Sequence, residues 1–141
     1  MSNTTIEKSM FLKAAPEVVW SYLTNKDRLA EWFHEATADL QPNREYELIS
    51  RSDNGGTERI CWGTVLEMEP HSHLKYTFTV KPLNGALTTV TWTLEEVNGG
   101  TRLSLQHEGI EAAAGEAAMG LLLALDRGWD DHLSQMRSAL H

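Results

Sequence analysis

One histidine of this 141-residue chain stands where an apolar side chain would be expected. His107 falls in phase with Leu103 and Leu105, and this period-two spacing places it on the apolar face of a strand. An imidazole there can anchor a bound molecule or exchange a proton near neutral pH. The more common interpretation of such a histidine is an interior residue whose hydrogen bonds are satisfied.

Asp126 is likewise a polar residue where an apolar one is expected, here on a helical segment. It follows Leu122 by four residues and precedes Trp129 by three, so the three share one helix face. A carboxylate on an apolar face is costly unless it is paired or hydrogen-bonded. Two interpretations stay open: Asp126 meets a ligand in a cavity, with His107 as an acid–base partner, or it is paired with a neighbour or lies at the rim.

Other catalytic and metal-binding patterns are missing or incomplete. His71 and His73 are two imidazoles near one turn, but no HExxH motif or cysteine pair completes a zinc site. The glycine-containing turns match no phosphate-binding loop, and no Gly-x-Ser-x-Gly elbow is present. We therefore expect no metal and no cofactor, and we assign no catalytic residue.

The composition is that of an acidic globular chain. Hydrophobic residues make up 41%, charged residues make up 23%, and the net charge is −8, which disfavours nucleic-acid and anionic-membrane partners. A lone Cys61 excludes an internal disulfide and suits a reducing compartment. The start of the chain lacks a signal core, and the apolar run 121–125 is too short to span a bilayer. We expect one domain over residues 1–141, in the cytoplasm and without a membrane span.

The segments that position these residues begin with a strand and two short helices. Residues 5–13 are compatible with a strand, and Pro16 suits the first turn of a helix. Residues 24–27 end that helix and cap a second one. In the second helix Trp32 shares a face with the adjoining Phe33, which puts two aromatic rings where the helices meet the next layer.

Period-two alternation dominates residues 34–109. Strands are predicted at 74–80, 90–94 and 103–107, each with one apolar face. Glycine-containing turns separate the strands and favour hairpins; they lie at 53–56, 84–85 and 98–100. This pattern predicts an antiparallel meander of about six strands after the helices.

The last part of the chain, about 111–140, is predicted to be helical. Its apolar positions form one stripe, namely Leu122, Trp129, Leu133, Met136 and Leu140. At a rise of about 1.5 Å per residue such a helix can cross a whole sheet. Gly115 and Gly120 interrupt its alanine-rich beginning, so either the entrance to a cavity is loosened there or the helix starts later.

A curved sheet, two short helices and one long helix leave a space between them. We expect the two short helices to close one end of it with Trp20, Trp32 and Phe33. The remaining volume is a candidate cavity for a small, largely apolar molecule held by a few polar groups. Its expected lining is Trp32, Phe33, Tyr46, Tyr76, Phe78, Trp92, His107, Met119, Leu122 and Asp126.

Four segments, in order, resemble one known family. They are 15–20 with 29–33, 63–78, 89–105, and 128–133. They are similar to the activator of heat shock protein 90 ATPase homologue-like family, within the START-like (SRPBCC) superfamily. The resemblance implies an α+β helix-grip fold, in which a curved antiparallel sheet of about seven strands wraps a long C-terminal helix. Residues 42–46 depart from the family pattern, which has a glycine pair there.

The resemblance also shapes the expected function. Superfamily relatives bind lipids, hormones or polyketides in a cavity, and some catalyse reactions on them. We expect a non-enzymatic binding protein for a small hydrophobic molecule. The alternatives are a cyclase- or hydrolase-type enzyme and a chaperone-interaction module that uses its outer surface. The sequence leaves open whether the protein forms a homodimer.

Overall fold

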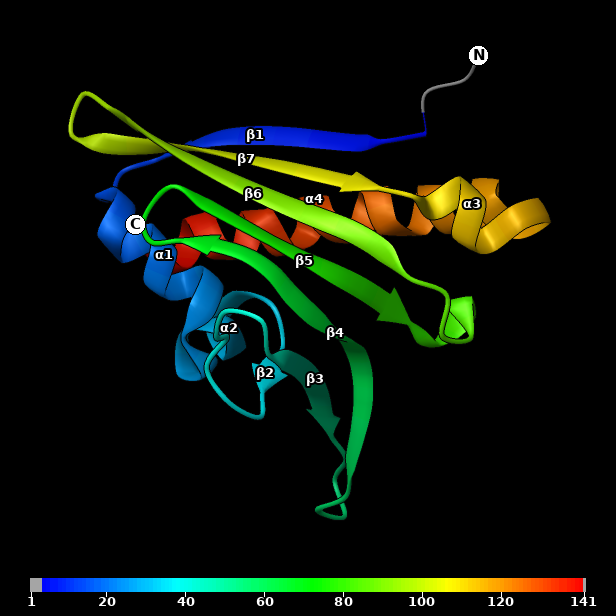
Figure 1. Cartoon of the computed structure of the whole chain (residues 1–141). Helices are drawn as coiled ribbons and strands as arrows, with labels where there is room; N and C mark the ends of the chain where they lie inside the picture. The colour runs from blue at the N-terminus through cyan, green and yellow to red at the C-terminus, as the bar shows by residue number, and fades with distance from the viewer. Residues whose placement is uncertain (1–3, 141) are drawn as a thin grey trace.

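The computed structural model describes residues 4–140. The chain forms seven strands, and helices lie at one end and along one face of their sheet (Figure 1). In chain order the elements are β1 (Ile6–Leu12), α1 (Pro16–Thr24), α2 (Lys26–Trp32), β2 (Glu35–Ala36), β3 (Glu45–Arg51), β4 (Thr57–Glu69), β5 (His73–Val80), η1 (Lys81–Leu83), β6 (Thr88–Val97), β7 (Gly100–Glu108), α3 (Ile110–Ala114), η2 (Gly115–Ala117) and α4 (Ala118–Leu140).

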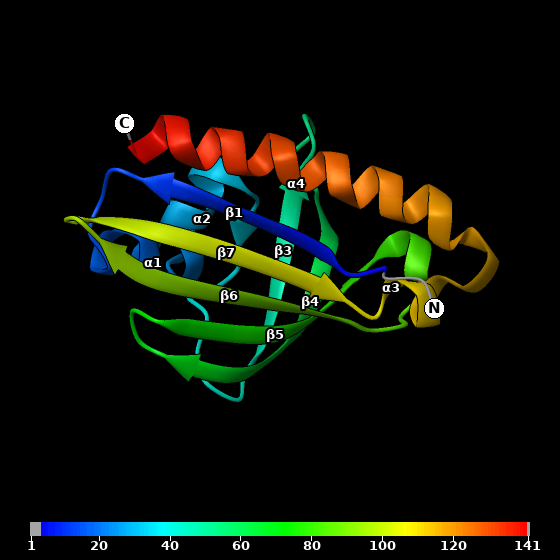
Figure 2. The same cartoon turned by 90° about the horizontal axis from the view of Figure 1, so that it is seen from above.

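The strands form one antiparallel sheet in the order β1-β7-β6-β5-β4-β3-β2. The pairing of β4 shifts register twice, against β3 between Leu48 and Ile49 and against β5 between Val65 and Glu67. Such irregularities bend strands and increase twist, and here they accompany the curl of the sheet. Helix α4 lies along the sheet, and α1 and α2 cover one end (Figures 1 and 2). The predicted helix-grip fold is confirmed.

Helices α1 and α2 join where the sequence predicted a break. The Asn25 side chain accepts hydrogen bonds from the backbone N–H groups of Asp27 and Arg28 and so caps α2. At the other end of α2 the Trp32 indole N–H donates to the carbonyl of Tyr22 at 2.6 Å. The Trp32 ring packs edge-on against Trp92 of β6. The two short helices are thereby fixed against the sheet.

The structure decides two local features of the predicted elements. The helical segment near the C-terminus is broken at Gly115, which has a φ of +58°, a backbone conformation that glycine adopts more readily than other residues. The long helix therefore starts at Ala118. Asn84 and Gly85 both have a positive φ, 55° and 94°, and together with η1 they connect the antiparallel strands β5 and β6, as the turn pattern predicted.

The long helix buries one stripe against the sheet. Trp129, Leu133 and Met136 are buried, as predicted, whereas Leu122 and Leu140 are only partly buried. Among residues 4–140 no helix has both the length and the apolar character that a membrane crossing requires.

Replacing Trp129 by alanine should remove the largest side chain that α4 inserts into the core. We expect Trp129→Ala to lower the free energy of unfolding by about 3–5 kcal/mol, as large-to-small core changes do. Urea denaturation measures the loss. Trp62→Ala, at a half-buried tryptophan that packs on Arg59, is the control and should cost less. A loss for Trp129→Ala no greater than the control's would contradict this packing.

Candidate functional site

A pocket of about 120 Å³ lies between α4 and the sheet, next to the end of α2. Its walls come from four parts of the chain, and most of its lining is apolar. The lining residues are Phe33, His34, Cys61, Phe78, Val80, Ala124, Leu125, Gly128, Trp129 and His132.

Gly128 gives this pocket part of its volume. A Cβ atom added at Gly128 would meet no atom within 4 Å, so the space beside the helix there is empty. The neighbouring Trp129 supplies a rigid wall: its ring stacks on Phe33 with centroids 5.3 Å apart. Leu125 and His132 complete the helix side of the pocket, at the spacing of one helix face.

Of the side chains predicted to line a cavity, Phe33 and Phe78 line this pocket. Four others are buried in the core instead, and hydrogen bonds hold their polar atoms. Trp92 donates from its indole N–H to the Tyr76 hydroxyl at 2.9 Å, and the Tyr46 hydroxyl donates to the carbonyl of Thr77 at 2.6 Å. Trp32 is bonded to Tyr22 as described above. These four rings fill volume that the sequence assigned to the cavity; they are Trp32, Tyr46, Tyr76 and Trp92.

His107 lies behind the pocket wall and has all its hydrogen bonds satisfied. Its Nδ1 accepts a hydrogen bond from the Trp129 indole N–H at 3.0 Å. Its Nε2 lies 2.8 Å from the Thr88 hydroxyl, which itself donates to the carbonyl of Phe78. The hydroxyl must therefore accept from His107, which fixes the ring as the Nε2–H tautomer. The prediction that His107 meets a ligand is not supported by this placement, because the Trp129 ring lies between His107 and the pocket.

Asp126 lies outside the pocket, on the side of α4 that faces β1. Lys8 reaches across from β1 and pairs with Asp126 at 2.7 Å and with Asp130 at 2.9 Å. The Lys8 side chain is mostly buried, whereas both aspartates are more than half exposed. Burial lowers the pKa of Lys8, but its hydrogen bonds with Asp126 and Asp130 outweigh this and raise it overall. Asp126 is thus a paired residue at the rim, and it does not meet His107 as an acid–base partner.

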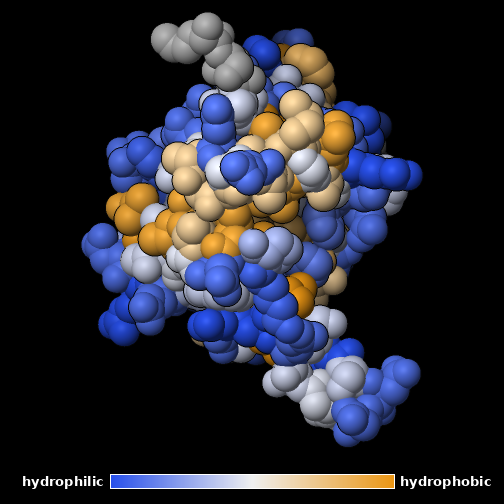
Figure 3. Space-filling view, turned by 90° about the vertical axis from the view of Figure 1, so that its right-hand side faces the viewer, coloured by the Kyte–Doolittle hydropathy of each residue, from blue (hydrophilic) through white to orange (hydrophobic). Residues whose placement is uncertain are grey.

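Met119 and Leu122 also fall outside the pocket, because the first turns of α4 lie beyond the densest part of the core. The Met119 side chain is 65% exposed and Leu122 is partly buried beside the start of β1. With Leu123, which is also exposed, they belong to an apolar end of the molecule. Figure 3 shows apolar side chains gathered on the face where α3, η1 and the start of α4 lie.

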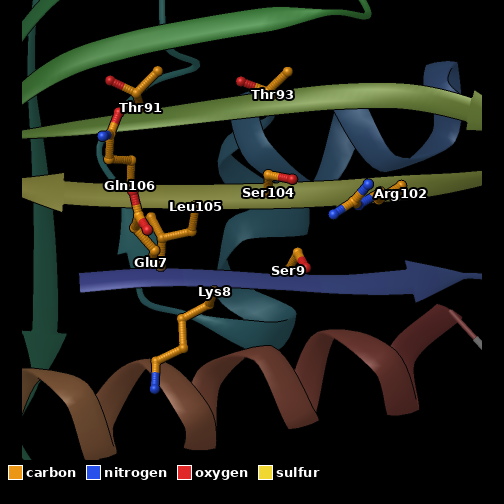
Figure 4. A pocket seen from close by; sticks show the side chains of 9 residues that line it. All are labelled: Glu7, Lys8, Ser9, Thr91, Thr93, Arg102, Ser104, Leu105 and Gln106. Carbon is orange, nitrogen blue, oxygen red and sulfur yellow. The ribbon is translucent and has the colours of Figure 1, made fainter. Parts of the chain in front are cut away.

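The other hollows of the surface are larger, and their linings are more polar. One of about 390 Å³ lies on the sheet face away from α4, along β1, β7 and β6 (Figure 4). Its lining includes Ser9, Thr91, Thr93, Arg102 and Ser104. These side chains alternate with the buried ones of the same strands, as expected for a solvent-facing sheet surface. We therefore place the candidate site between α4 and the sheet.

Sequence analysis missed the two histidines of this pocket. The rings of His34 and His132 lie with centroids 5.0 Å apart, and both contact Phe33. Burial, and the charge of His132, lower the pKa of His34 to about 4. Burial also lowers the pKa of His132. Both rings are therefore neutral at pH 7. The spacing of His132 from Leu125 and Gly128 was the one available signal, but His34 follows the end of a helix and had none.

The buried His107 should make stability depend on pH. Burial lowers its pKa from 6.5 to about 4, so as the pH falls the unfolded chain takes up the proton first. Its contribution is complete above pH 6.5 and is lost as the pH falls towards 4, to a total of about 3 kcal/mol. His107→Gln keeps one acceptor and one donor without titrating in this range. We expect the variant to lose less stability than the wild type between pH 7 and pH 4, measured by urea denaturation.

Substitution of the partly exposed His73 by glutamine controls for the loss of one imidazole. Equal acid sensitivity of His107→Gln and the wild type would contradict the proposed role of His107.

The ion pairs of Lys8 should hold α4 to the edge of the sheet. Lys8→Met keeps the length of the side chain and leaves two exposed aspartates, which water can solvate. We expect a loss of about 1 kcal/mol in the free energy of unfolding, the upper range for surface pairs. Lys81→Met removes an exposed pair with Glu58 and should cost nearly nothing. A loss of several kcal/mol for Lys8→Met would mean that the aspartates are not solvated as described.

Comparisons with known proteins agree with this fold. A family model described as activator of Hsp90 ATPase homolog 1-like protein matches residues 13–141. A crystal structure from Chromobacterium violaceum is 23% identical, with a TM-score of 0.78 over 97% of this chain and 96% of that one. One from Mesorhizobium loti is 23% identical, with a TM-score of 0.74 over 95% and 94%.

A solution structure of the Aha1 dimer from Colwellia psychrerythraea is 18% identical, with a TM-score of 0.71 over 96% of this chain and 95% of that one. At these identities the likeness to solved structures shows the fold alone. Comparison with curated protein sequences finds no match. The family model, in contrast, spans nearly the whole chain, and the protein belongs to the activator of Hsp90 ATPase homolog 1-like family.

Proposed function

We propose that this protein binds a small, largely apolar molecule, which inserts a ring-sized group into the pocket between α4 and the sheet. The lining supports this most directly, since every lining residue except His34 and His132 is apolar, counting the Cys61 thiol. An apolar cavity of about 150 Å³ is known to hold a benzene molecule. The pocket of about 120 Å³ has room for one ring or one short branched chain.

The rest of such a ligand has an apolar surface to lie on. Leu125 in the pocket and Leu121 one turn earlier share a face of α4, and both pack against the core while remaining partly exposed. Exposed patches of this kind mark binding sites for apolar partners. The family to which the chain belongs often binds hydrophobic ligands.

The alternatives predict different sites. A cyclase or hydrolase would need reacting groups in the pocket, and the pair named from the sequence, His107 and Asp126, is not assembled there. A chaperone-interaction module would use the outer surface and would tolerate a filled pocket. The homodimer remains a prediction, which sedimentation at several protein concentrations tests.

Filling the pocket from its empty side should abolish binding. In Gly128→Leu the new side chain would occupy the space beside the helix, and we expect at least a tenfold weaker affinity for 4-ethyltoluene. The probe is titrated while the tryptophan indole N–H signals are followed by NMR, and in the wild type the Trp129 signal should shift saturably.

Gly120→Leu is the matched control. Gly120 also lies in α4 with open space around it, but outside the pocket. Both changes replace a helical glycine and should stabilise the helix by up to about 1 kcal/mol, so both variants should fold. Undiminished binding by Gly128→Leu would refute the proposed site, as would equal losses in the two variants.

A further inference from the structure

The two imidazoles in the apolar pocket, His34 and His132, have ring nitrogens that form no hydrogen bond with residues 4–140. Nδ1 of His132 lies 3.3 Å from the carbonyl oxygen of Trp32. A carbonyl only accepts, so Nδ1 carries the hydrogen, and Nε2 of the neutral ring is left with a free lone pair. His34 contacts Phe33 and His132 through its ring, and neither of its nitrogens bonds to any residue from 4 to 140.

These nitrogens differ from those of His107, although all three rings are partly or fully buried. In His107, Nδ1 is bonded to Trp129 and Nε2 to Thr88, so neither nitrogen is free to bond to a ligand. His34 and His132 together offer at least one acceptor and one donor at the wall of the pocket. Polar groups of this kind in an apolar pocket fix the orientation of a ligand.

The charges around the pair disfavour a charged ligand. No lysine or arginine lines the pocket, and the carboxylate of Asp131 acts on His132. The chain as a whole has a net charge of −8, so an anion would meet no compensating positive charge here. A cation would have to be desolvated among Phe33, Val80 and Leu125, and no carboxylate of residues 4–140 lines the pocket to pair with it.

His34 and His132 lack the further ligands that a metal site would need. Cys61 is the nearest additional ligand type in the lining, but burial raises the pKa of its thiol to about 12, which disfavours the thiolate that a metal needs. Among the described residues no three side chains of histidine, cysteine, aspartate or glutamate are placed to hold a metal ion.

We propose that His34 and His132 recognise a neutral hydroxyl group on the ligand, which donates to Nε2 of His132 and accepts from the N–H of His34. The ligand class is then a phenol or an alcohol with an apolar body. This inference rests on the proposed function, because it assigns the polar end of the molecule whose ring occupies the pocket. A hydroxyl is matched to this pair because it can donate and accept at once.

The test compares 4-ethylphenol with 4-ethyltoluene, which has a methyl group in place of the hydroxyl. Dissociation constants are measured by NMR titration of wild type, His132→Phe and His34→Phe. We expect His132→Phe to weaken the affinity for 4-ethylphenol roughly 3- to 10-fold, the value of one hydrogen bond. His34→Phe should also weaken this affinity. The affinity for 4-ethyltoluene should stay within about twofold of wild type in both variants. His73→Phe, at a partly exposed histidine of β5 outside the pocket, should leave both constants unchanged.

The outcomes separate the two proposals. Equal changes in both probes would show that the histidines only shape the pocket, and would overturn the inference while leaving the proposed function intact. Tighter binding of 4-ethylbenzoate than of 4-ethylphenol by the wild type would overturn it in favour of an anionic ligand. If neither 4-ethyltoluene nor 4-ethylphenol binds the wild type, the proposed function fails and the inference fails with it.

Discussion

A hydrogen bond from the Trp129 indole to His107 fixes the long helix against the interior of the sheet. It continues through Thr88 to the backbone of Phe78, so one chain of polar contacts links α4 to β7, β6 and β5. All of its members are buried, and removing one partner would leave a donor or acceptor unsatisfied. The bond therefore sets how closely α4 packs against the sheet and which of its faces turns towards it.

The candidate pocket follows from that position of the helix. With Trp129 held inward, the neighbouring Gly128 faces empty space, and the ring of Phe33 stacks against Trp129 from the end of α2. The pocket stays small because other aromatic rings already fill the interior, with Trp92 packed edge-on against both Trp32 and Trp129. The fold thus combines a dense core with a limited opening along one side of the helix.

Electrostatics divide the helix into two sides. The side facing β1 holds Asp126 and Asp130 against Lys8, where water still reaches the carboxylates. The pocket side has neutral imidazoles among apolar groups, because burial lowers the pKa values of His34 and His132. A ligand entering there would meet hydrogen-bonding groups without net charge, and this distinguishes the pocket from the polar surface of the sheet.

The sequence alone determined the order of strands and helices, the burial of Trp129 and the interior position of His107, because periodicity specifies which face of an element is apolar. It did not determine how deeply each inward-facing side chain is buried. Strand alternation could not tell the core rings of Trp92 and Tyr76 from the pocket ring of Phe78, since all three point inward. Helical spacing placed Asp126 with Trp129, but a helix stripe is wide, and its flank meets Lys8 of β1 at the rim. Only tertiary packing brought His34 and His132 together, because no local pattern links residues so far apart in the chain.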